Sequence, residues 1–140
     1  MKTPTYPKYE NKQKRLELLK EMVLLWQAIV DNPEWSDKEA AENMPELRHI
    51  LDYRSECPAC QYDEIVLQDL EKAGIYSTEC RHCAIEEWRN AHCFSGTYAE
   101  WKEAQLHNEF GRAAELADRI AELAETNACN IEHEIKMEQR

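Results

Sequence analysis

The sequence lacks most of what loop-rich and membrane-spanning proteins need. It holds three Gly and five Pro in 140 residues, too few for a turn-rich β-sandwich or a long low-complexity region. The longest apolar run, Met22 to Val30, has nine residues and includes Gln27, whereas a membrane span needs about 20. No apolar stretch follows the polar N-terminus, so we expect no secretory signal and a cytoplasmic protein.

Charge is abundant and unevenly distributed. The net charge is −11, with six basic and two acidic side chains in residues 1–20 (+4) and three basic and twelve acidic ones in residues 31–71 (−9). A negative field repels the phosphate backbone, so we expect no general nucleic-acid binding. The acidic body suits a basic protein partner, although an acidic surface can also simply keep a small protein soluble.

Hydrophobic spacing predicts a mainly α-helical fold. Hydrophobic residues make up 43% of the chain, which is enough for the core of one domain. Apolar residues recur at steps of three and four from Glu10 to Val30, the pattern of an amphipathic helix. Asn32-Pro33 is expected to end that helix.

Three shorter helices are indicated further along the first half of the chain. Ser36 followed by Glu39 is a capping-box pattern that opens a helix. Pro45 suits the first position of the next helix. An apolar segment over residues 65–72, closed by Gly74, is typical of a third.

Residues 97–140 predict one long amphipathic helix. Thr97 and Glu100 form a second capping-box pattern at its start. Its apolar stripe follows a heptad-like spacing over roughly three and a half heptads. The stripe consists of Leu106, Phe110, Ala113, Leu116, Ala117, Ile120, Leu123, Ala124, Asn127 and Ile131. It either packs on the first helix of its own chain or forms a coiled-coil homodimer with a second copy, and Asn127 either sets the register or marks fraying.

Two cysteine pairs predict a zinc site. Cys57 and Cys60, then Cys80 and Cys83, form C-x2-C pairs separated by nineteen residues, a spacing typical of zinc sites. Four thiolates fill a tetrahedral shell and leave no position for water, so we expect one structural Zn²⁺ per chain. Two pairs of reduced cysteines or a redox pair remain alternatives, although a redox pair needs a βαβ context that the sequence does not show.

Other residues near the cysteine pairs have structural interpretations. Cys93 is expected to be a buried small residue or a neighbour of the zinc site, and Cys129 a core residue. His92 next to Cys93 makes a poor base for it, since adjacent helical residues point in different directions. Three aromatic side chains are expected to cover the metal site from the core: Trp88, Tyr98 and Trp101.

No catalytic motif or Gly-rich phosphate loop is present. We therefore expect no catalytic residues, no cofactor besides zinc and no enzymatic activity. The chain divides into an extended basic arm (1–9), a helical zinc-knuckle domain (10–96) and a long C-terminal helix (97–140) that packs on it or self-associates. Arg54, Arg81 and Arg89 are candidates to hydrogen-bond the metal-bound sulfurs and offset their charge.

The cysteine region resembles a group of small phage-encoded proteins of uncharacterised function. The likeness covers residues 55–101, on the run Cys57-x-x-Cys60-x-Tyr62, Cys80-x-x-Cys83, Trp88, Cys93 and Ser95-x-x-Tyr98-x-x-Trp101. The resemblance implies a zinc site at the four paired cysteines and an accessory role in the cytoplasm of a phage's host. It implies no known activity.

These observations favour a non-enzymatic, zinc-stabilised phage accessory protein that binds another protein, of the host or of the phage. In a sharper form of this hypothesis, the acidic face inhibits a host or defence enzyme that acts on nucleic acid. The alternative is a zinc-knuckle regulator that binds nucleic acid through the basic arm, residues 1–9.

Overall fold

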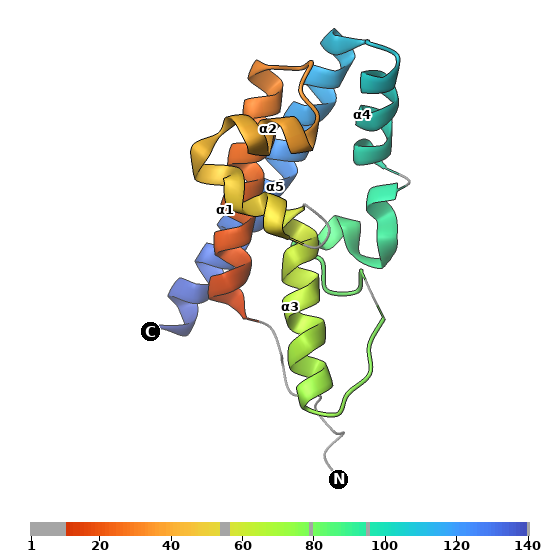
Figure 1. Cartoon of the computed structure of the whole chain (residues 1–140). Coiled ribbons are helices and arrows are strands. Elements are labelled where there is room, and N and C mark those ends of the chain that lie inside the picture. Colours follow the sequence, from red (N-terminus) through yellow and green to blue (C-terminus); the bar gives the residue numbers. More distant parts are fainter. Residues whose placement is uncertain (1–10, 54–56, 79, 95, 140) are drawn as a thin grey trace.

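The computed structural model describes residues 11–53, 57–78, 80–94 and 96–139, so the predicted arm over residues 1–9 lies outside it. Its described part is helical and contains no strand, as predicted. The elements, shown in Figure 1, are α1 (Lys12–Asp31), α2 (Asp37–Asn43), the 3₁₀ helix η1 (Pro45–Asp52), α3 (Pro58–Lys72), the 3₁₀ helix η2 (Glu86–Phe94), α4 (Thr97–Leu106) and α5 (Phe110–Glu138). None of these helices has the length and apolarity to cross a membrane.

Helices α1 and α5 form the backbone of the fold as an antiparallel pair (Figure 1). Lys12 at the start of α1 lies 3.4 Å from Glu134 near the end of α5 and also pairs with Glu138. The buried stripe of α5 faces the same core as that of α1. The apolar stripe of α5 therefore packs on the first helix of its own chain, which is the first of the two predicted arrangements. The homodimer stays a prediction.

Local sequence signals set the ends of several helices. The predicted capping box forms, with the Ser36 hydroxyl accepting from the Glu39 amide at 3.1 Å and the Glu39 carboxylate accepting from the Ser36 amide at 3.3 Å. Pro45 opens η1, where its fixed φ and missing N–H are tolerated. Gly74 follows α3 with φ +76°, a conformation that favours glycine.

Helix α3 begins earlier than the sequence indicates. The apolar segment predicts residues 65–72, but the helix starts at Pro58 and takes in the whole first C-x2-C pair. Pro58 at the first helical position explains this start, because that position needs no N–H donor. Cys57 thus occupies the N-cap position of α3 without a capping hydrogen bond from its side chain, and Cys60 lies in the first turn.

The C-terminal region contains two helices where the sequence predicts one. Helix α4 ends at Leu106 and α5 starts at Phe110, and between them Asn108 has φ +54°, a left-handed conformation that asparagine tolerates. Leu106 is 80% exposed as a result and does not belong to the stripe. The predicted Thr97 cap is also wrong, since Gly96 precedes the helix and no side chain caps it.

An aromatic cluster fills the core between α1, α4 and η2. The ring centroids of Trp26 and Trp101 lie 4.6 Å apart in an edge-to-face arrangement. Tyr98 contacts both of these rings and also Trp88, at centroid distances of 5.7 to 6.0 Å. Trp88 and Trp101 are buried, which confirms the core interpretation of these aromatics.

Candidate metal centre

The first cysteine pair lies at the N-terminus of α3. Cys57 has extended backbone angles and stands at the N-cap position, and Cys60 follows one turn later. A hydrogen bond between the two thiols, together with burial, raises the pKa of Cys57 well above its ordinary value. A redox-active cysteine needs a lowered pKa, because its thiolate is the nucleophile. The raised pKa of Cys57 differs from that of such a cysteine; whether the pair binds metal or is redox-active stays a prediction.

The second pair lies in a loop that is docked against the first turns of α3. Asp63, itself 6% exposed, accepts hydrogen bonds from the amides of Cys80 at 2.9 Å and His82 at 2.7 Å. Farther along the loop, the amide of Ala84 donates to the carbonyl of Ala59 at 3.2 Å. These three bonds bring the loop to the end of α3 that carries the first cysteine pair.

Cys83 is the most buried of the cysteines, with 4% of its surface exposed. Burial raises the pKa of its thiol, and a hydrogen bond from the backbone N–H of Ile85 opposes that shift. The charges of Cys60 and Cys93 also raise this pKa. Of the four predicted ligands, Cys57 and Cys60 lie at the start of α3, and Cys80 and Cys83 lie in the loop that is hydrogen-bonded to it.

His82, inside the second pair, is turned toward a different partner. Its ring Nε2 lies 3.1 Å from the Ser77 hydroxyl. Burial lowers the pKa of the ring, with further lowering by Arg89 and Arg81. The Arg89 side chain itself donates to the carbonyl of Cys83 at 3.2 Å. Arg89 is one of the three arginines predicted to offset the charge of metal-bound sulfurs. Arg54 lies outside the described residues.

The chemistry of the four paired cysteines fits a thiophilic ion such as Zn²⁺, since thiolate sulfur is the donor such an ion prefers. In the described part of the chain, no three His, Cys, Asp or Glu side chains are arranged as a metal ion requires. The zinc site at Cys57, Cys60, Cys80 and Cys83 stays a prediction.

Comparisons with protein-family models, with curated proteins and with solved structures find no match for this chain. The interpretation of the site therefore rests on its own residues.

A buried polar network behind the cysteines joins the loop to the α1–α5 pair. Arg15, 5% exposed, donates to the carbonyl of Ala84 at 2.9 Å and to the side chain of Asn127 at 3.1 Å. The Asn127 side chain also accepts from the amide of Glu86 at 3.1 Å and donates to the carboxylate of Glu87. Asn127 is 3% exposed and its side chain both donates and accepts hydrogen bonds, so it does not mark fraying of the helix. It connects α5 to the segment that follows Cys83.

Cys129 is exposed, and its predicted place in the core is wrong. The buried positions around it, Ala124, Asn127, Ala128 and Ile131, follow the three- and four-residue spacing of one helix face. Position 129 falls on the opposite face. Cys93 is half-buried and packs against the core; its interpretation as a neighbour of a zinc site stays a prediction.

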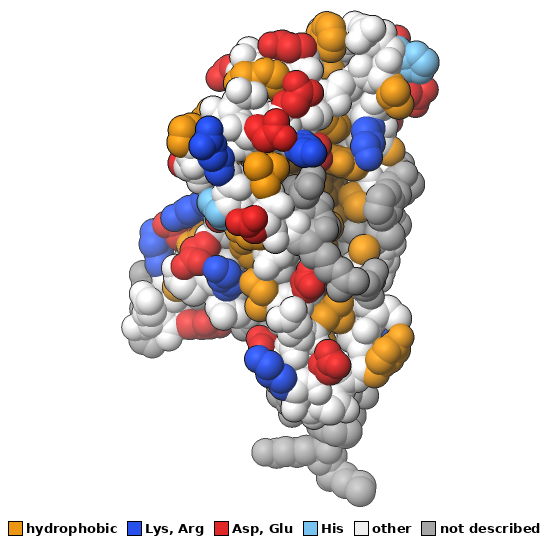
Figure 2. Space-filling view, in the orientation of Figure 1, with side chains coloured by type: hydrophobic (Ala, Val, Ile, Leu, Met, Phe, Trp, Pro, Cys, Tyr) orange, Lys and Arg blue, Asp and Glu red, His pale blue; other side chains and the backbone are white. Residues whose placement is uncertain are grey.

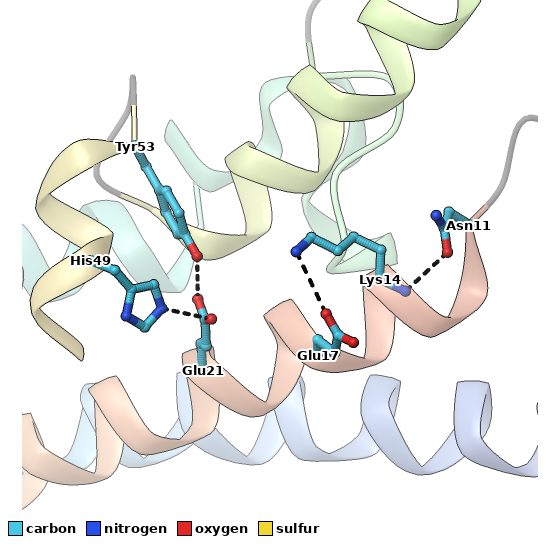
Figure 3. Close-up of polar contacts among 6 residues, drawn as sticks. All are labelled: Asn11, Lys14, Glu17, Glu21, His49 and Tyr53. Carbon is cyan, nitrogen blue, oxygen red and sulfur yellow. Dashed lines mark hydrogen bonds and ion pairs between the residues drawn. The ribbon is translucent and has the colours of Figure 1, made fainter. Parts of the chain in front are cut away.

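Polar contacts on the other side of α1 hold η1 in place (Figure 3). The Glu21 carboxylate accepts from the Tyr53 hydroxyl at 2.6 Å and lies 2.8 Å from Nε2 of His49. Figure 3 also shows the Lys14–Glu17 pair, at 3.5 Å, on the exposed first turns of the helix. The tyrosine bond is the partly buried one of this group and ties the end of η1 to α1.

Tyr53 is expected to titrate late in alkaline solution. Burial, then its hydrogen bond to Glu21 and the charge of that carboxylate, raise the pKa of Tyr53 well above 10. Since only the unfolded state ionises near pH 10, this tyrosine lowers stability as the pH rises above about 10 and has no such effect below it. Tyrosinate absorbance should show one fewer late-titrating tyrosine in Tyr53→Phe. The control Tyr76→Phe, at a side chain 90% exposed, should keep the full late phase; an identical loss in both variants would contradict the assignment.

Proposed function

We propose that this chain is a zinc-stabilised, non-enzymatic binding protein whose acidic surface over residues 31–52 binds a basic segment of a partner protein. The observation that carries this proposal is the charge of that segment, which holds seven acidic and two basic side chains, a net of −5. Six of the acids are exposed: Asp31, Glu34, Glu39, Glu42, Glu46 and Asp52. Figure 2 shows acidic side chains gathered over the part of the molecule where α2 lies.

A protein partner fits this surface better than nucleic acid does. A negative surface speeds encounter with a positive partner and suppresses approach by phosphate. An enzyme that acts on nucleic acid has such a positive surface, which supports the sharper form of the proposal, inhibition of a host or defence enzyme. The phage accessory role rests on the resemblance of residues 55–101. The regulator with a basic arm depends on residues 1–9, outside the described part of the chain.

We propose a non-enzymatic function because the sequence holds no catalytic motif. Burial raises the pKa of Cys83, and burial with the Cys60 thiol raises that of Cys57. Protonated thiols are weak nucleophiles. A structural zinc ion would displace the protons of these thiols, because it binds the thiolate form.

Charge reversal on the acidic surface tests the proposal. We expect the triple variant Glu34→Lys, Glu42→Lys and Glu46→Lys to weaken binding to the cationic probe poly-L-lysine by at least about tenfold at low salt, because it changes the local charge by +6. The same variant should lose any protein that the tagged wild type retains from a nuclease-treated bacterial lysate. Binding is measured by titration and by co-purification.

The matched control reverses three acids on the exposed face of α5, Glu115→Lys, Glu122→Lys and Glu125→Lys. It should keep most of the partner, since these acids lie outside residues 31–52. Equal loss in both variants would show a general charge effect and contradict the proposed surface. A retained species that disappears with nuclease would favour the nucleic-acid regulator instead.

A further inference from the structure

Two apolar side chains lie exposed where α4 turns into α5, and we call them the apolar tip. Leu106 at the end of α4 is 80% exposed, and Phe110 at the start of α5 is 37% exposed. The other large hydrophobic residues that are exposed in the described chain lie on α1, in the loop after α3 and near the end of α5: Leu24, Tyr76 and Met137. Single exposed apolar residues are ordinary, whereas apolar residues gathered on one turn and bordered by polar ones are typical of an interaction site.

The geometry of this turn does not require an apolar residue at the end of α4. The amide of Asn108 donates to the carbonyl of Gln105 at 3.1 Å. The amide of Glu109 donates to the carbonyl of Ala104 at 2.9 Å. With Asn108 at φ +54°, these bonds form a Schellman motif, which ends a helix by backbone contacts. The hydrophobic contact that accompanies such a motif is made by other positions, so neither the turn nor the core explains the exposed Leu106.

Two side-chain hydrogen bonds hold α4 against the start of the acidic surface. The Gln105 side chain donates to the carbonyl of Trp35. The Tyr98 hydroxyl donates to the Asp37 carboxylate at 3.0 Å. The apolar tip begins one residue after Gln105, so it adjoins residues 31–37 at the end of the molecule where α1 passes into α2 (Figure 1). Figure 2 shows hydrophobic and acidic side chains together at that end.

We propose that the apolar tip and the acidic surface together bind an amphipathic basic helix of the partner protein. The apolar face of that helix is seated on Leu106 and Phe110, and its lysine and arginine side chains reach the acids of residues 31–52. This inference rests on the proposed function and adds to it the form of the basic segment, which becomes a helix with an apolar face.

Charge complementarity selects this occupant. Residues 31–37 hold three acidic and no basic side chains, and residues 100–112 hold three acidic and two basic ones, so the tip is bordered by a net charge of −4. A second copy of this chain seated on the tip would bring two such borders together, and like charges across an interface oppose binding. A partner with lysine or arginine beside its apolar residues gains from both kinds of contact.

A helix suits this surface better than an extended segment does. An extended segment binds by adding a strand to a sheet edge, and the described part of the chain contains no strand. The surface is built from helices whose backbone groups are already bonded within them, so side chains have to make the contacts. An amphipathic helix offers such contacts from one face, with apolar residues three and four positions apart.

The test uses the full chain and two synthetic helical peptides of about 14 residues that differ only in their apolar face. Both carry lysine on one face; the first carries leucine on the other face and the second carries alanine. We expect the wild type to bind the leucine peptide at least about tenfold more tightly, because burial of leucine contributes more than burial of alanine. The double variant Leu106→Ser and Phe110→Ser should lose about tenfold for the leucine peptide and less than about twofold for the alanine peptide. Titration by fluorescence anisotropy measures both.

The matched control replaces two exposed apolar residues elsewhere, Tyr76→Ser and Met137→Ser, and should bind the leucine peptide as the wild type does. Equal loss in the two double variants would show unspecific hydrophobic binding and overturn the inference. The single variant Leu106→Ser changes a side chain that is 80% exposed, so it should keep the circular dichroism of the wild type. It should still lose about threefold for the leucine peptide, which separates loss of a contact from loss of the fold.

Failure of this inference and failure of the proposed function give different results. Leucine-peptide binding that is unchanged without Leu106 and Phe110 would overturn the inference and leave the acidic surface in place. Poly-L-lysine binding that survives charge reversal at Glu34, Glu42 and Glu46 would end the proposed function, whatever the tip does. A wild-type dimer that becomes a monomer in Leu106→Ser, measured by sedimentation velocity, would place a second copy on the tip and overturn the inference.

Discussion

Replacing Asn127 by alanine is expected to lower the free energy of unfolding by about 3 kcal/mol. The substitution removes an acceptor for the buried Arg15 guanidinium and for the Glu86 amide, at 3.1 Å each. Buried polar groups that lose their partners in this way destabilise the folded state far more than an exposed contact does. Urea unfolding followed by circular dichroism measures the change.

The matched control for this prediction is Asn130→Ala, three residues along the same helix at an exposed position. It should change the free energy of unfolding by less than about 0.5 kcal/mol. Both variants change asparagine to alanine within α5, so helix propensity affects them alike. Equal effects at the two positions would show that the buried network contributes little.

The second large effect is expected in the aromatic core, where Trp26→Ala should lower the free energy of unfolding by about 4 kcal/mol. Trp26 is 2% exposed and lies against Trp101 and Tyr98. Its removal leaves a large cavity that the packed helices fill only in part. The control Leu24→Ala, at a side chain on the same helix that is 46% exposed, should have a much smaller effect.

A double-mutant cycle tests whether the two indoles also interact directly. With Trp26→Leu and Trp101→Leu alone and combined, the coupling energy should be about 1 kcal/mol, as for edge-to-face aromatic pairs. A coupling energy near zero would mean that the stability comes from burial of each ring separately.

Short-range signals predicted the first half of the fold well. The helix expected from residue 10 to residue 30 is observed at residues 12–31, and the cap at Ser36 forms as expected. Such signals work because the groups that satisfy a helix end lie within four residues of it. The early start of α3 was missed because the prediction assigned Cys57 and Cys60 to a metal knuckle. Pro58 between them is the signal that could have revealed it.

The break before α5 and the buried network were not predicted. Asn108 is a local sign of the break, since asparagine tolerates a left-handed conformation. The network depends on Arg15, which lies within an apolar stripe and gave no sign of the buried partner more than one hundred residues away. The interaction becomes visible only when α1 and α5 are packed together.

The sequence by itself determined the helical class, the amphipathic faces of α1 and α5, the helix ends at Ser36 and Gly74, and the clustering of acidic charge in residues 31–52. These follow from spacing and from residue chemistry within a few positions. Only the tertiary structure decided that Arg15 reaches Asn127 and that Cys129 faces outward. The reason is physical: a side chain's neighbours across the fold depend on how whole helices pack, and packing is a property of surfaces that no local window of sequence contains.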